Sequence, residues 1–139
     1  MNFPYTCLPG IPKDTKRPLI PVKFIHQGKS TLPILSLVDS GADYSYLTME
    51  VAKLLEIDLS SVKFEKSFGI NGSAFLCYPS KITIEIGGHK LDIPVRFSNQ
   101  LGTPFKCVLG QEDFFSKTRI TFERYKWNLD IRIVENNKR

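Results

Sequence analysis

Strict alternation of apolar and polar residues, the two-residue period of a β-strand, is the main pattern along this chain. The clearest stretch covers residues 81–86, where isoleucine occupies every second position. The Gly87-Gly88 pair then predicts a turn, and the alternation resumes over residues 91–97. The side chains that we expect this strand pair to bury are Ile82, Ile84, Ile86, Leu91, Ile93, Val95 and Phe97.

Other β-rich runs lie between turn-forming residues along most of the chain. They cover residues 19–25, 30–38, 62–68, 73–78, 105–109, 119–123 and 127–134, with a short extended piece at 44–47. Many short strands separated by turns predict a mainly β domain in the form of a closed or nearly closed barrel. In the last strand pair the candidates for burial are Ile120, Phe122, Trp127, Leu129, Ile131 and Ile133.

Two short helices complete the predicted secondary structure. The first begins at Thr48, whose hydroxyl can cap it, and continues to about Glu56 with its apolar residues on one face. The second covers residues 111–117, where Glu112 and Asp113 fall in the first turn and suit the helix dipole.

The chain length of 139 residues indicates one domain, which we place at residues 19–134. Residues 1–18 contain four prolines and predict a flexible arm, and the polar residues 135–139 predict a frayed tail. No apolar run is long enough to span a membrane and no signal peptide is evident, so we expect a cytoplasmic protein without membrane contact.

Composition limits the cofactors and partners that we expect. The three cysteines have no paired spacing and predict free thiols in a reducing compartment, while the two histidines stand apart. We therefore expect no metal site and no cofactor. The net charge of +5 comes from basic residues spread along the chain, which favours a solvated surface over a nucleic-acid site.

The most informative segment is Leu-Ser-Leu-Val-Asp-Ser-Gly-Ala-Asp at residues 35–43. Asp39 follows an apolar strand directly and opens a turn of small residues, so packing of the strand fixes the position of its carboxylate. Asp-Ser-Gly is also an ordinary turn sequence. A second motif, the Cys-Val-Leu-Gly of residues 107–110, precedes the second predicted helix.

From about residue 19 to residue 133, the order and separation of these motifs resemble the retropepsin-like aspartic proteases. Their half-site is Asp-Thr/Ser-Gly-Ala after a hydrophobic strand, completed by a hydrophobic-hydrophobic-Gly strand before a helix. The resemblance implies that Asp39 is catalytic, that Ser40 hydrogen-bonds near or across the catalytic pair, and that Gly41 gives a tight turn and a substrate contact. It also implies that Ala42 and Asp43 line the cleft.

The same resemblance implies a homodimer. Hydrolysis by carboxylates needs one base and one acid, and two carboxylates about 3 Å apart share a proton in this way. Because the motif occurs once, the second Asp39 would come from a second copy across a two-fold axis. Gln111 stands where many retroviral members have an arginine that pairs with the acid corresponding to Asp43, so that brace is absent here or is supplied by another residue.

A hairpin with a flexible tip is predicted from residues 62–78. Its tip residues are Gly69, Ile70, Asn71 and Gly72. In the resembled family a flap hairpin at this place closes over the bound polypeptide, which lies as an added strand in the cleft. The tip residues are therefore candidates for substrate binding, although an ordinary surface hairpin has the same sequence features.

Two other functions fit the sequence. One is a non-catalytic dimeric peptide-binding module on the same fold, in which Asp39 is only a turn residue. The other is a basic β-barrel that binds nucleic acid through aromatic residues such as Phe64, Phe68, Phe75 and Tyr78, although aromatic residues at alternating strand positions more often fill cores. The prediction that we prefer is an aspartic endopeptidase acting on polypeptides as a homodimer.

Overall fold

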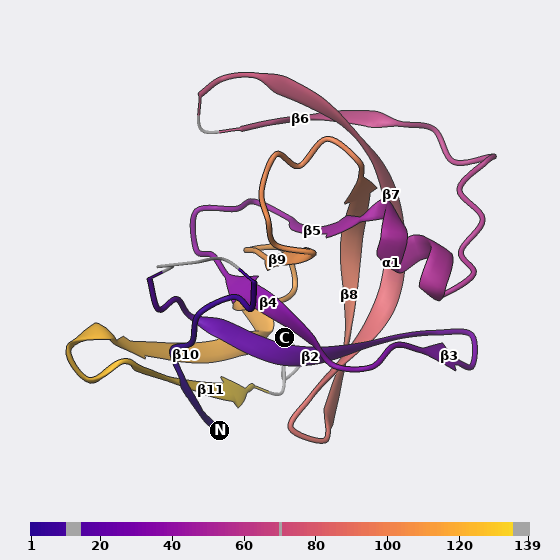
Figure 1. Cartoon of the computed structure of the whole chain (residues 1–139). Coiled ribbons are helices and arrows are strands. Elements are labelled where there is room, and N and C mark those ends of the chain that lie inside the picture. Colours follow the sequence, from indigo (N-terminus) through magenta and orange to yellow (C-terminus); the bar gives the residue numbers. More distant parts are fainter. Residues whose placement is uncertain (11–14, 70, 135–139) are drawn as a thin grey trace, which may run out of the picture.

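A computed structural model describes residues 1–10, 15–69 and 71–134 of the chain. Figure 1 shows two β-sheets and little helix. The larger sheet contains β2 (Leu19–His26), β3 (Lys29–Ser30), β4 (Ile34–Val38), β5 (Ser45–Thr48), β6 (Glu65–Phe68), β7 (Ala74–Ile86), β8 (His89–Ser98) and β9 (Cys107–Leu109). The smaller sheet contains β1 (Asn2–Pro4), β10 (Thr118–Glu123) and β11 (Asn128–Ile133). The helices are α1 (Met49–Leu54) and the 3₁₀ turns η1 (Phe115–Lys117) and η2 (Arg124–Lys126).

The larger sheet closes on itself. Its strands follow the order β3-β2-β4-β9-β5-β8-β7-β6, and an additional pairing joins β2 to β7. Strands β2, β4, β9, β5, β8 and β7 therefore form a ring, in which β4 pairs with β9 and β5 with β8 in parallel. The predicted mainly β architecture with a closed barrel is confirmed.

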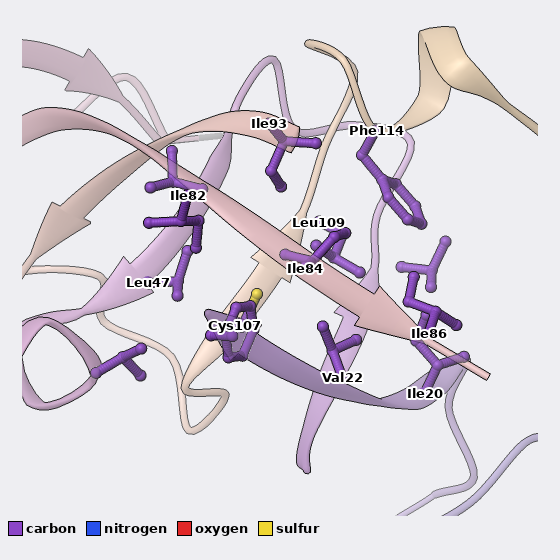
Figure 2. Packing of buried hydrophobic residues seen from close by; sticks show 14 of the residues in the cluster. Ile20, Val22, Leu47, Ile82, Ile84, Ile86, Ile93, Cys107, Leu109 and Phe114 are labelled. Carbon is purple, nitrogen blue, oxygen red and sulfur yellow. The ribbon is translucent and has the colours of Figure 1, made fainter. Parts of the chain in front are cut away.

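The barrel interior is filled by the alternating residues of its longest strands. Ile82 on β7 pairs directly with Ile93 on β8, and both side chains are buried. Figure 2 shows the β7 isoleucines packed with residues from β2, β5 and β9. The alternation therefore predicted this part of the core correctly, except that Leu91, near the hairpin turn, is only partly buried.

The strand boundaries differ from the prediction at two prolines. The predicted strand over residues 30–38 is broken at residues 31–33, where Pro33 has no N–H to donate. Residues 73–78 and 81–86 were predicted as separate strands, yet they form one continuous β7 through Pro79. Its partner β8 pairs with it on both sides of this proline, so the ladder continues.

The predicted helices are only partly correct. Thr48 does precede α1, but its hydroxyl makes no capping bond and is buried without a hydrogen-bond partner. Residues 111–114 form turns followed by η1, so the second predicted helix is wrong. Asp113 lies in the left-handed region at φ 62°, which interrupts a helix after a few residues. No helix among the described residues is long and apolar enough to cross a membrane.

The start of the chain is more ordered than predicted. Residues 2–4, which we expected in a flexible arm, form β1 and pair with β11. The amino group of Met1 donates to the backbone oxygen of Ile131 at 2.8 Å and lies 3.2 Å from a carboxylate oxygen of Asp130. The proline-rich composition misled the prediction because Pro4 occupies an edge strand, where a missing N–H is tolerated. Residues 11–14 of the arm and the predicted tail, 135–139, lie outside the described residues.

The smaller sheet buries only part of what the sequence predicted. Leu129 and Ile131 are fully buried, and Ile120 and Ile133 partly so. Phe122 remains 41% exposed, because it lies on β10 at the edge of this sheet, where no other strand of the described residues covers it.

The three cysteines differ in exposure, and this leads to a testable expectation. Cys7 is exposed, whereas Cys77 and Cys107 are buried. Burial raises the pKa of the Cys107 thiol from 9.0 to about 12, against a smaller opposing effect of a hydrogen bond with Ser36. We expect a thiol reagent at pH 8 to modify Cys7 within minutes and the other two only after unfolding, as counted by mass spectrometry. Rapid modification of Cys107 in the folded protein would contradict this burial.

The same pKa shift gives a pH dependence of stability. Between pH 9 and about 12 the Cys107 thiol ionises only in the unfolded state, because its folded pKa is raised. Its contribution to stability is therefore complete below pH 9 and is lost as the pH rises toward 12.

Candidate active site

The two sequence motifs lie side by side in the barrel. Strand β4 carries the residues before Asp39 and pairs in parallel with β9, so that Leu37 lies opposite Val108. The ladder continues one step further, because the Asp39 backbone N–H donates to the Leu109 oxygen at 3.0 Å. Two segments about seventy residues apart in sequence therefore fix the backbone from which the Asp39 carboxylate projects.

The Asp39 side chain is held by its own turn. The Gly41 N–H donates to Asp39 Oδ1 at 2.9 Å, and the Ala42 N–H donates to the Asp39 backbone oxygen at 3.2 Å. A Cβ atom at Gly41 would lie 3.3 Å from the same Oδ1, closer than most real Cβ contacts. The glycine at position 41 therefore leaves space around the Asp39 carboxylate. The bond from Gly41 goes to Oδ1, and this turn donates none to Oδ2.

Gly110 allows the second motif to pack against the turn. A Cβ at this position would lie 2.6 Å from the Ala42 backbone oxygen and closer still to that of Tyr44. The Gly110 N–H donates to Ser45 Oγ at 3.0 Å. Backbone atoms cannot move aside cheaply, so this close approach requires glycine.

Gln111 braces the turn from within the same chain. Its side-chain amide donates to the Ser40 backbone oxygen at 2.8 Å, and its backbone N–H donates to the Ala42 oxygen at 2.8 Å. Glu112 continues the contact by donating its N–H to the Asp43 oxygen at 3.0 Å. Many retroviral proteases have an arginine at this position. Here the uncharged Gln111 holds the Asp39 turn through hydrogen bonds.

A cavity of about 340 Å³ opens above this turn, and we call it the Asp39 groove. It is lined by Leu37, Asp39, Gly41, Ala42, Asp43, Tyr46, Phe68, Gly69, Phe75, Leu101, Thr103 and Val108. Phe68 is the last residue of β6, Gly69 follows it, and Phe75 comes from β7, so the predicted hairpin forms one wall. Figure 1 shows this β6–β7 hairpin arching over the barrel end that carries β5 and β9.

The groove gathers part of the predicted site. Asp39, Gly41, Ala42, Asp43 and Gly69 line it, whereas Ser40, Asn71 and Gly72 do not. The Ser40 carbonyl is engaged by Gln111, and the hairpin tip is closed by a bond from the Gly69 N–H to the Ser73 oxygen at 2.9 Å. Asn71 accepts from the Ser73 N–H, Gly72 sits in the left-handed region at φ 81°, and Ile70 lies outside the described residues.

The sequence alone did not identify the aromatic and apolar wall of the Asp39 groove. Tyr46 and Phe75 meet edge to face with ring centroids 5.5 Å apart. They come from β5 and β7, which are not neighbours in the sheet, so no local pattern could pair them. Leu37 and Val108 could have been inferred, because each lies two residues before Asp39 or Gly110 on its strand.

A cluster of polar side chains connects the β6–β7 hairpin to the barrel strands β5 and β8. Ser67 on β6 accepts from the Tyr46 hydroxyl at 3.1 Å and from Arg96 Nη1 at 3.1 Å, and its hydroxyl lies 3.4 Å from the Cys77 sulfur. The Arg96 guanidinium also stacks 3.7 Å from the ring centre of Tyr44. Desolvation by burial raises the pKa of Tyr46, so its hydroxyl stays protonated as a donor. The arms of the hairpin are therefore tied to the barrel, while the bonds described for Gly69, Asn71 and Gly72 at its tip are local.

The chemistry of the groove rests on its carboxylates. Among the described residues no group of three or more His, Cys, Asp or Glu side chains could hold a metal ion. Asp39 lies partly buried at the floor, with Asp43 exposed at the side. One carboxylate can take or give a proton, yet it cannot do both in the same step.

The fold that these elements define is retropepsin-like, as the sequence resemblance predicted. A crystal structure of a retropepsin-like aspartic protease from Rickettsia conorii superposes with a TM-score of 0.63 at 18% identity, covering 94% of this chain and 98% of that one. The EIAV protease complexed with the inhibitor HBY-793 gives a TM-score of 0.53 at 23% identity, over 68% of this chain and 82% of that one. No family model and no curated protein sequence matches this chain.

Proposed function

We propose that this protein is an aspartic endopeptidase that acts as a homodimer, with one Asp39 from each copy. The observation that carries the proposal is the position of Asp39 at the floor of a groove that has the β6–β7 hairpin as one wall, in a retropepsin-like fold. The carboxylate is held on one oxygen by the Gly41 N–H, and its mounting strand is fixed by β9. A catalytic group must keep a fixed position, and a backbone held in this way provides one.

Two such carboxylates supply the base and the acid of peptide hydrolysis. The ionised Asp39 takes a proton from water, whose oxygen attacks the peptide carbonyl carbon, and the protonated Asp39 gives its proton to the carbonyl oxygen. The resulting gem-diol then collapses. The C–N bond breaks as the nitrogen gains the proton that was taken from water, while one gem-diol hydroxyl gives its proton to the other carboxylate. A carboxylic acid and an amine leave, and the pair again holds one proton. Ser40 and Gly41 support this turn through their backbones.

The substrate proposed is an extended polypeptide. A strand lying in the Asp39 groove would place alternate side chains against its apolar wall, including Leu37, Phe75 and Val108. Asp43, beside Asp39, is positioned to accept a peptide N–H, and Ala42 leaves room for the strand. Closure of the hairpin tip, residues 69–72, would exclude bulk water from the reacting bond.

The pH profile of peptide cleavage tests this function. We expect a bell-shaped rate with its maximum on the acid side, because only the pair with one proton holds both an acid and a base. A pair with both carboxylates ionised lacks the acid, and a pair with both protonated lacks the base. Digestion of an unfolded protein from pH 3 to pH 9, followed by mass spectrometry of the fragments, measures this. A rate that continues to rise above pH 8 would exclude the carboxylate pair.

A further inference from the structure

The Asp39 groove ends at Tyr46 on one side. A row of side chains crosses its floor, because Leu37 on β4 lies opposite Val108 on β9, and Val108 lies opposite Tyr46 on β5. Residues that lie opposite each other share a face of the sheet, and all three line the groove. The next residue of the row is Arg96 on β8, which does not line it. Tyr46 is therefore the last side chain of the floor in this direction.

Tyr46 contacts the β6–β7 hairpin at two points. Its hydroxyl donates to Ser67 Oγ at 3.1 Å, and its ring meets the Phe75 ring edge to face. Ser67 on β6 lies opposite Phe75 on β7 in the ladder of the hairpin, so both contacts are made by one face of the hairpin. The floor and the hairpin wall of the groove therefore meet at Tyr46 and close this end.

The Tyr46 side chain is fixed in this position. Ser67, which accepts from its hydroxyl, also accepts from Arg96 Nη1 at 3.1 Å, and the Arg96 guanidinium is stacked on Tyr44. Tyr44 itself lies edge to face with the Tyr46 ring, with ring centroids 6.4 Å apart. The Tyr46 ring thus has two aromatic neighbours and a bonded hydroxyl. A side chain held by packing and hydrogen bonds in this way forms a rigid wall.

We propose that Tyr46, backed by Phe75, limits the size of one substrate side chain and restricts that position to glycine, alanine or serine. The inference rests on the proposed function and adds its specificity. The centroids of the two rings are 5.5 Å apart, which is the contact distance of an aromatic pair. A branched or aromatic substrate side chain would have to displace one of the rings, and Tyr46 could move only by breaking its bond to Ser67.

The geometry limits where the restricted residue lies in the substrate. Strand β5 is two strands away from β4, about 10 Å, and an extended peptide covers that distance with roughly three residues. The restricted position therefore lies within about three residues of the bond that is cut. A homodimer presents the same subsite twice about its two-fold axis, so the restriction should appear at equal distances on both sides of that bond.

Cleavage-site profiling measures this selectivity. Peptides from a digested cell extract are incubated with the protein at its pH of maximal activity, and mass spectrometry identifies the bonds that are cut. The wild type should exclude leucine, isoleucine, phenylalanine and methionine at the restricted positions. Tyr46→Val removes the ring and should admit them. For two peptides that differ only in alanine or leucine at this position, the ratio of kcat/KM should shift by about tenfold or more in favour of leucine.

Further variants separate the size of the ring from its hydrogen bond and from folding. Tyr46→Phe keeps the ring and loses only the bond to Ser67, so it should keep the exclusion. Phe75→Ala removes the second ring and should relax the exclusion at the same position, which keeps the test decisive where Tyr46→Val does not fold. The matched control is Tyr125→Val. This tyrosine is 80% exposed and does not line the groove, so the control should keep the wild-type profile.

The outcomes distinguish the role of Tyr46 from the function on which it rests. Active Tyr46→Val and Phe75→Ala variants with the wild-type profile would overturn the size limit and leave the protease function intact. The same holds for a wild type that accepts large side chains at every position around the cut bond. Equal relaxation in Tyr46→Phe and Tyr46→Val would also contradict the size limit, because the ring is still present in the first. A wild type that cuts no peptide overturns the proposed function, and the inference with it.

Discussion

Replacement of Asp39 by asparagine is expected to reduce kcat/KM for peptide cleavage by at least about 10³-fold. The amide has nearly the same shape and can still accept the Gly41 N–H through its oxygen, so the turn should keep its structure. It cannot, however, take a proton from water or release one to the carbonyl oxygen. Fragments quantified by mass spectrometry over time, at the pH of maximal wild-type activity, measure the loss.

Asp92→Asn serves as the matched control. This carboxylate on β8 accepts a hydrogen bond from the Thr83 hydroxyl and does not line the Asp39 groove. It should cleave as fast as the wild type. Both variants should sediment as the wild type does. If the Asp39 variant retains activity, the catalytic role of Asp39 is wrong. If no form cleaves any peptide while the dimer still binds peptides, the non-catalytic module becomes the better interpretation.

Gly110→Ala is expected to lower the free energy of unfolding by about 3 kcal/mol and to abolish cleavage. The added methyl group would clash with the backbone oxygens of Ala42 and Tyr44, which lie between Asp39 and the first residue of β5. Relief requires β9 and that turn to separate, which would also break the bond from the Asp39 N–H to Leu109. Urea unfolding monitored by circular dichroism measures the change.

Gly69→Ala is the corresponding control, since a Cβ there would make only ordinary contacts, the nearest at 3.4 Å, and its φ is not positive. Its unfolding free energy should stay within about 0.5 kcal/mol of the wild type. If the Gly110 and Gly69 variants have the same unfolding free energy, the two motifs can separate without loss of stability. The requirement for glycine at position 110 would then be wrong.

The sequence was most informative where the period of two extends over many residues. The isoleucines of β7 and the inward residues of β8 were predicted because each strand has one core face and one outer face. The same reasoning placed Asp39 at the end of a strand. It could not supply the pairing of β4 with β9, which depends on a contact between distant segments. The family resemblance indicated only that the two motifs complete one half-site.

The failures have identifiable physical causes. The predicted helix at residues 111–117 has acidic residues where a helix prefers them, but hydrogen bonds from Gln111 and Glu112 to the Asp39 turn hold the backbone in another path. Hydrogen bonds between distant segments thus outweighed the local helix propensity of these residues. Residues 2–4 were predicted as flexible because the first 18 residues are rich in proline, and a three-residue strand has no detectable period that could indicate otherwise. Its pairing with β11 orders it.

The order in which the barrel is built has a consequence for biosynthesis. Strands β4 and β5 are close in sequence but are not bonded to each other, because β9, made much later on the ribosome, fits between them. A nascent chain that has not yet emerged past Gly110 lacks the segment that fixes the Asp39 backbone. Translation itself therefore delays assembly of the carboxylate site until residues 107–110 have been synthesised.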